Sequence, residues 1–138
     1  MELASSHVTP LVLRFQATPD QVGPARRAIA AYASKHGVID VHGVALAVSE
    51  AVSNAVVHAY ADAAEPGEVQ IVAERLADDG LEIRVCDQGR GMKARPDSPG
   101  IGVGLPLIAT LAEHLEVMAR PGGGTRLCMG FAVAESAR

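Results

Sequence analysis

The stretch from residue 46 to residue 60, LAVSEAVSNAVVHAY, constrains the fold more than any other part of the chain. Read at about 100° per residue, its small apolar side chains fall on one stripe that can face a core, which predicts a helix. Glu50, Asn54 and His58 follow one another at i,i+4 spacing along the edge of that stripe. A carboxylate can act as a general base or bind a metal, and a carboxamide oxygen is a hard ligand that suits Mg²⁺. The helix alone leaves two interpretations open, a chemical site or the ordinary polar margin of an amphipathic helix.

Three glycine-containing turns follow this helix, each beside a regular element. The run DQGRGM at 87–92 comes directly after the strand-like LEIRVC, and GIGVGL at 100–105 comes directly before the helix-like PLIATLAEHL. The run GGGT at 122–125 leads into the strand-like RLCMGFAV. Glycine N–H groups ahead of a helix can cradle phosphates, but this sequence has neither the Lys-Ser/Thr of a Walker A loop nor the frame of a dinucleotide fingerprint. Taken singly, each turn could also be a flexible loop, with Asp87 as a turn-capping residue.

The periodicity of the rest of the chain predicts the other elements. Alternating runs at 11–17, 68–76, 81–87, 115–120 and 125–133 predict strands, and helical periodicity predicts helices at 21–36, 41–61 and 104–114. Thr18 or Asp20 is expected to cap the first helix, Gly37 to end it, and Asp40 to cap the second. The order predicts an α/β (α+β) two-layer sandwich, with helices on one face of a mixed, mainly antiparallel sheet. Residues 1–10 are expected to form a flexible leader, and residues 11–138 a single domain.

Composition narrows the class of protein. With 138 residues, 49% of them apolar, the chain can bury a core. A formal charge of −4, spread without long runs, offers no basic footprint for nucleic acid. No apolar stretch is long enough to span a membrane, and the start, MELASSHVTP, lacks the pattern of a secretory signal. Cys86 and Cys128 lie in apolar strand-like runs and are expected to be reduced thiols, in keeping with a cytoplasmic protein.

These motifs, in this order, resemble the GHKL ATP-binding superfamily of gyrase, Hsp90, histidine kinases and MutL. Within that superfamily, SEAVSNAVVHAY is most similar to the anti-sigma factor serine kinases of bacterial sporulation and stress switches. The resemblance extends from about Leu11 to Val133. It implies the Bergerat ATP-binding fold, with ATP and Mg²⁺ as cofactors.

The resemblance also implies roles for individual residues. Glu50 would be the general base that activates the acceptor serine, and Asn54 would hold Mg²⁺ through its side-chain oxygen. Asp87 would accept a hydrogen bond from the adenine amine, supported by Thr125. His58 matches the family but is expected to be structural. The remaining nucleotide contacts would come from Gly89, Gly91, Met92, Gly100, Gly102, Val103, Gly104 and Leu105.

The function implied is that of an ATP-dependent serine kinase and anti-sigma factor. Its partners would be a sigma factor and an anti-anti-sigma protein of the STAS type, without direct contact to nucleic acid or membrane, and a homodimer is an option because the family's kinases dimerise. The loop from Gly89 to Gly104 is expected to be mobile and to order when ATP binds. Within it, the lid segment Lys93–Pro99 is only seven residues long. A lid this short keeps a second function open, a nucleotide-binding anti-sigma module or adaptor with little or no phosphoryl transfer. The catalytic fragment of a histidine kinase is a third, less favoured option.

Overall fold

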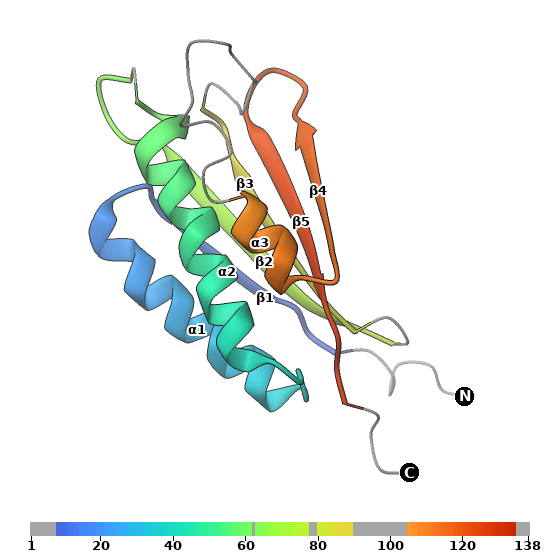
Figure 1. Cartoon of the computed structure of the whole chain (residues 1–138). Coiled ribbons are helices and arrows are strands. Elements are labelled where there is room, and N and C mark those ends of the chain that lie inside the picture. Colours follow the sequence, from blue (N-terminus) through green and yellow to red (C-terminus); the bar gives the residue numbers. More distant parts are fainter. Residues whose placement is uncertain (1–7, 62, 78–79, 90–104, 135–138) are drawn as a thin grey trace.

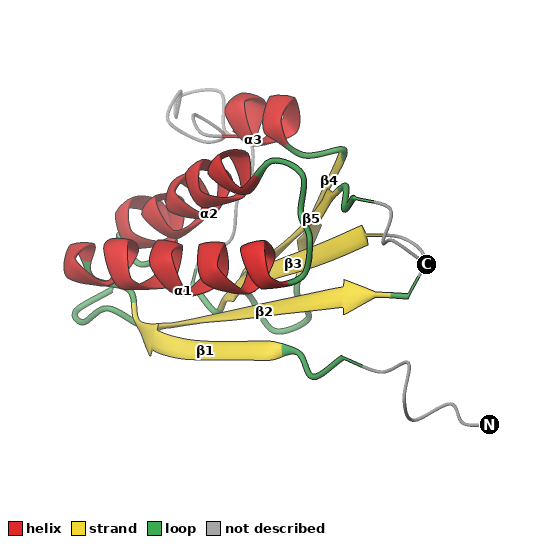
Figure 2. Cartoon of the chain, turned by 90° about the horizontal axis from the view of Figure 1, so that it is seen from below, coloured by secondary structure: helices red, strands yellow, loops and turns green. Residues whose placement is uncertain are grey.

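The computed structural model describes residues 8–61, 63–77, 80–89 and 105–134. Five strands form one sheet in the order β1-β2-β3-β5-β4. The three α-helices lie side by side on one face of this sheet, with α2 between α1 and α3 (Figures 1 and 2). The elements in chain order are β1 (Leu11–Gln16), the 3-10 turn η2 (Pro19–Gln21), α1 (Val22–Lys35), α2 (Val41–Asn54), the π-helical turn η3 (Ala55–Ala59), β2 (Glu68–Leu76), β3 (Gly80–Asp87), α3 (Leu105–Leu111), β4 (His114–Ala119) and β5 (Thr125–Phe131).

The architecture confirms the predicted α+β two-layer sandwich. Every pairing between the described strands is antiparallel, so these strands contain none of the parallel pairing that a mixed sheet would have. The strand β5 lies between β3 and β4, which puts the chain's last strand inside the sheet rather than at its edge. No helix in the described part of the chain is long and apolar enough to cross a membrane.

The core lies between the helices and the inner face of the sheet. Alternate residues of β2 and β3 are buried, as expected for strands with one face covered. The helix α2 supplies the centre of this core with valines one turn apart, and burying such a side chain contributes about 1.5–3 kcal/mol. The largest fully buried side chains are Ile29, Val44, Val48, Val52, Val69, Ile71, Leu81, Ile83, Ile108 and Met129.

The ends of α1 and α2 can be compared with the predicted capping residues. The Asp40 carboxylate accepts the Gly43 N–H at 2.8 Å and caps α2, as predicted. Gly37 follows α1 with a φ of +82°, the left-handed conformation that ends many helices. The prediction for the start of α1 is wrong. The Thr18 hydroxyl donates to the Asp20 carboxylate instead, and among the described residues no side chain caps α1.

Two predicted helices are shorter than expected. Regular α-helix ends at Asn54 and gives way to the π-helical turn η3, so the predicted helix to residue 61 is wrong beyond that point. A π turn bonds i to i+5, so His58 lies outside the regular i to i+4 bonding of α2 that holds Glu50 and Asn54. The predicted helix to residue 114 is also wrong, because α3 ends at Leu111 and His114 begins β4. His114 pairs with Gly130, and its ring covers that glycine, where an added Cβ would lie 2.0 Å from the ring Cε1.

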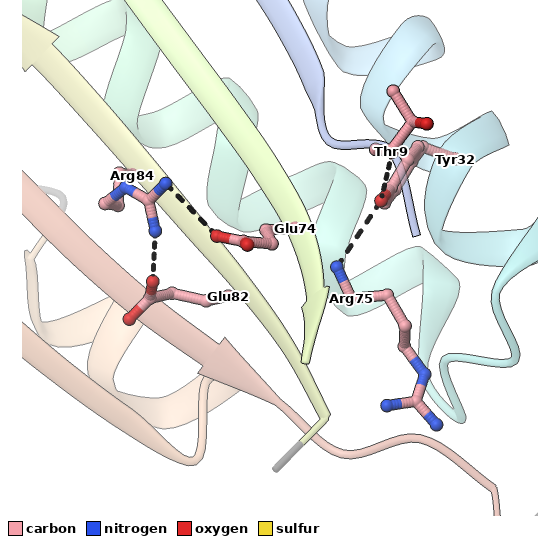
Figure 3. Close-up of polar contacts among 6 residues, drawn as sticks. All are labelled: Thr9, Tyr32, Glu74, Arg75, Glu82 and Arg84. Atoms are coloured by element: carbon pink, nitrogen blue, oxygen red, sulfur yellow. Dashed lines mark hydrogen bonds and ion pairs between the residues drawn. The ribbon is translucent and has the colours of Figure 1, made fainter. Parts of the chain in front are cut away.

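The outer face of the sheet is largely polar. Arg84 on β3 pairs with Glu82 and, at 3.4 Å, with Glu74 on β2 (Figure 3). At the sheet end that holds the C-terminus of β2, the Tyr32 hydroxyl donates to the Thr9 carbonyl at 3.0 Å and accepts the Arg75 N–H at 3.4 Å (Figure 3). This tyrosine therefore ties α1 to the sheet at that end.

Candidate nucleotide site

Among the described residues, Asn54, Asp87, Gly89 and Thr125 lie at one end of the molecule, where the C-terminal ends of α2, η3 and β3 meet the start of β5 (Figure 1). Asp87 is the last residue of β3 and pairs with Thr125, the first residue of β5. Gly89 lies directly against η3, since an added Cβ there would be 2.0 Å from the Ala59 carbonyl oxygen. The turn after Asp87 therefore rests on the backbone that follows Asn54.

Asp87 is a buried carboxylate held by backbone donors. The residue is 8% exposed, and its Oδ1 accepts the Gly89 N–H at 2.9 Å. Burial raises the pKa of Asp87, and the backbone N–H groups of Gly89 and Thr125 and the charge of Arg120 oppose that rise. A carboxylate fixed in this way has a defined direction for accepting one further hydrogen bond, such as that from an exocyclic amine.

Asn54 has a buried carboxamide whose nitrogen makes no hydrogen bond within the described residues. It is 7% exposed, and its Nδ2 has no hydrogen-bond partner in the described part of the chain. An unpaired buried N–H donor costs about 1–3 kcal/mol, which fits a side chain whose Nδ2 donates to a ligand acceptor such as a phosphate oxygen, whereas only its Oδ1 could hold a cation. Glu50 lies one helical turn earlier on α2 and is half-buried. A carboxamide with a neighbouring carboxylate supplies the oxygen ligands that Mg²⁺ prefers, so these residues fit that ion.

Comparison of the sequence with known protein families identifies the family of this chain. The family described as "Histidine kinase-like ATPase domain" matches residues 15–131. The chain belongs to that family.

Three relatives of this histidine kinase-like ATPase domain are named as an anti-sigma factor or as a serine-protein kinase. An "Anti-sigma F factor" of Clostridium acetobutylicum is 29% identical over 130 residues, covering 85% of this chain and 89% of the relative. Another, of Clostridium beijerinckii, is 33% identical over 116 residues, covering 75% and 80%. The "Serine-protein kinase RsbW" of Bacillus velezensis is 33% identical over 135 residues, covering 86% and 83%.

In this ATPase domain, only part of the predicted nucleotide contacts can be placed. Thr125 is 2% exposed, and its backbone N–H donates a hydrogen bond to the Asp87 carboxylate. Leu105 begins α3 and packs against the core. His58 is half-buried in η3. The predicted residues outside the described part of the chain are Gly91, Met92, Gly100, Gly102, Val103 and Gly104, together with the predicted lid; so is the predicted ordering of the loop after Gly89.

Two residues at this end of the ATPase domain were missed by the sequence reasoning. Arg120, after β4, donates through Nη1 to the Asp87 carbonyl oxygen at 2.9 Å. No spacing rule could have found a contact across 33 positions. Tyr60 stands within the quoted helical stretch but received no role, and its hydroxyl accepts the Gln88 N–H at 2.8 Å. The signal that the sequence offered was its place at the end of the helical stretch that carries Glu50 and Asn54.

Proposed function

We propose that this chain is an ATP-dependent protein serine kinase that also acts as an anti-sigma factor, with Asn54 and Asp87 holding opposite ends of the nucleotide. One observation carries the proposal. In a histidine kinase-like ATPase domain, a buried carboxamide whose Nδ2 has no partner among the described residues lies at the same end of the molecule as a buried carboxylate. Both groups incur a cost for burial that a ligand would offset.

The protein groups have distinct roles in this proposal. Bound ATP supplies the phosphoryl group that is transferred. Asp87 accepts a hydrogen bond from the adenine amine, which favours adenine over guanine because guanine carries a carbonyl there. The Asn54 side-chain oxygen would hold Mg²⁺, and the ion would supply positive charge that stabilises the phosphate groups of ATP. Glu50, one turn from Asn54, takes the proton of the serine hydroxyl as general base.

The partners follow from the names of the relatives. The names "Anti-sigma F factor" and "Serine-protein kinase" support a sigma factor as one partner and a protein substrate as the other. We assign the substrate to the anti-anti-sigma proteins of the STAS type. The two free thiols, Cys86 and Cys128, favour a reducing, cytoplasmic location.

A homodimer through the β1 edge is part of this proposal. The strand β1 is at one edge of the sheet and, among the described strands, pairs only with β2, so its other side could pair with a second copy. A groove of about 470 Å³ runs between β1 and α1, lined partly by Val12, Phe15 and Pro24. An edge strand beside an apolar groove suits the same surface of a second copy, and sedimentation equilibrium tests it.

The roles of Glu50 and Asn54 can be separated by experiment. Glu50→Gln keeps the size of the side chain, so it should bind Mg·ATP normally and lose phosphoryl transfer by about 10²–10⁴-fold. Asn54→Ala should lose Mg²⁺-dependent ATP affinity and activity together. The matched control is Ser49→Ala, since this half-buried hydroxyl only donates to the Ala45 carbonyl within α2. The measurements are calorimetry with Mg·ATP and phosphoserine formation on the anti-anti-sigma protein of the same organism.

The same assay decides between the two functions. Transfer by Glu50→Gln at the parent rate would remove Glu50 as the base. If the unmutated chain binds Mg·ATP and the partner but never phosphorylates it, the chain is the nucleotide-binding anti-sigma module that a seven-residue lid segment also allows.

A further inference from the structure

Tyr60 joins three segments at the nucleotide end of the molecule. It follows η3 directly, six residues after Asn54. Its hydroxyl donates to the Glu68 carbonyl oxygen at 2.7 Å and accepts the Gln88 N–H at 2.8 Å. A single oxygen atom thus connects the end of the α2–η3 segment, the start of β2 and the residue after Asp87.

Close packing fixes the tyrosine ring as well as its hydroxyl. An added Cβ on Gly67 would lie 2.3 Å from the Tyr60 ring carbon Cε1, so the ring lies directly against the Gly67 backbone. The Gly67 carbonyl in turn accepts the Ala17 N–H at 2.8 Å. Burial raises the pKa of the Tyr60 phenol, so the hydroxyl stays neutral at physiological pH and can both donate and accept.

The connection spans the two groups that the proposed function assigns to opposite ends of ATP. Asn54 precedes Tyr60 on the same continuous helical segment, and Asp87 precedes the bonded Gln88 by one residue. The separation of these two side chains must match the length of the nucleotide if both are to bind it at once. A rigid connection between the segments would hold that separation before the ligand arrives.

We propose that Tyr60 is a positioning residue that sets the spacing between Asn54 and Asp87, so that Mg·ATP engages both ends of the site together. This inference rests on the proposed function. A purely structural tyrosine would affect every ligand of the folded protein alike. A spacing residue affects a ligand that reaches both ends more than one that reaches only Asp87.

Adenosine and Mg·ATP distinguish these two roles. Tyr60→Phe keeps the ring against Gly67 and removes both hydrogen bonds. We expect the Kd of Mg·ATP to rise about tenfold, the effect of losing two ordinary hydrogen bonds to the site's frame, while the Kd of adenosine changes by less than about twofold. Both are measured by calorimetry on the full chain.

Tyr32 provides a matched control. Its hydroxyl also bridges two backbone groups, the Thr9 carbonyl and the Arg75 N–H, at the opposite end of the sheet (Figure 3). Tyr32→Phe should lower thermal stability by an amount similar to Tyr60→Phe and leave both nucleotide affinities unchanged. The control thus separates loss of stability from loss of spacing.

A double-mutant cycle completes the test. In an Asn54→Ala background, Tyr60→Phe should raise the Kd of Mg·ATP by less than about twofold, because the contact at the Asn54 end of the site is already lost. If Tyr60→Phe raises the Kd of adenosine and of Mg·ATP by the same factor, or changes neither, the spacing role is overturned while the proposed function stands. If the unmutated chain fails to bind Mg·ATP, both the proposed function and the role of Tyr60 are overturned.

Discussion

The turn between β4 and β5 offers two glycines that separate backbone strain from damage to the nucleotide site. Gly124 is buried, with a φ of +102°, and an added Cβ would lie 2.1 Å from the Asp87 carbonyl oxygen and 2.8 Å from the Gln88 Cα. Gly122 lies in the same turn with a φ of +82°, and an added Cβ there meets nothing within 4 Å among the described residues. Alanine is strained at both positions but collides with the site at only one of them.

The magnitudes follow from that difference. Positive φ costs a residue with a Cβ about 1–2 kcal/mol, which is the whole expected loss of stability for Gly122→Ala. At Gly124 the contact of 2.1 Å must open by more than about 1 Å to reach an ordinary carbon–oxygen separation of about 3.3–3.6 Å. That movement also strains the hydrogen bond from Arg120 to the Asp87 carbonyl oxygen. We therefore expect Gly124→Ala to lower the free energy of unfolding by about 3–4 kcal/mol.

The functional effect should differ more than the stability. A shift of about 1 Å at Asp87 should lower kcat/KM for ATP by about 10²-fold in Gly124→Ala, whereas Gly122→Ala should keep the parent value. Urea unfolding and steady-state kinetics of both variants, at a temperature where both are folded, provide the test. Equal ATP kinetics in the two variants would refute the argument that this turn supports Asp87.

Two further predictions concern charge and packing. Because burial raises the pKa of Asp87 above its ordinary 3.8, the affinity for adenosine should fall as the pH is lowered through that raised value, since only the ionised carboxylate accepts the amine well. The same shift makes ionised Asp87 oppose folding, so its contribution to stability declines as pH rises through this window. Arg120→Gln should move the midpoint of adenosine binding to higher pH, and calorimetry across pH showing an unmoved midpoint would contradict this. Ile108→Ala, at a fully buried position of α3, should lower the free energy of unfolding in urea by about 2–5 kcal/mol. Leu107→Ala, at a partly exposed position, should lower it by less than about 1 kcal/mol. Similar losses in the two variants would contradict the assigned packing of α3.

Local rules predicted the features that depend on neighbours in the chain. The i,i+4 spacing of Glu50 and Asn54 holds because both lie within the regular part of α2. The Asp40 cap and the Gly37 helix end were predicted because each depends on a few adjacent residues. The strands were predicted to within a few residues because their alternation reflects one covered face.

Local rules failed where distant segments compete. His114 was predicted to be helical, but pairing with Gly130 on a neighbouring strand draws it into β4. The helix through residue 61 was predicted as continuous, but it changes to η3 where its backbone meets Gly89. In both cases a contact with a remote segment outweighs a weak local preference.

The sequence by itself determined which residue types could form the site. It also indicated the family, because the composition and order of the motifs can be read directly from the sequence. Tertiary structure alone decided how these residues are held. It placed β5 beside β3, which brings Thr125 against Asp87, and it brought Arg120 and Tyr60 to the same turn. These contacts join positions 28 to 38 residues apart in the chain. Their geometry depends on sheet order and on how α2 ends, which short-range periodicity does not encode.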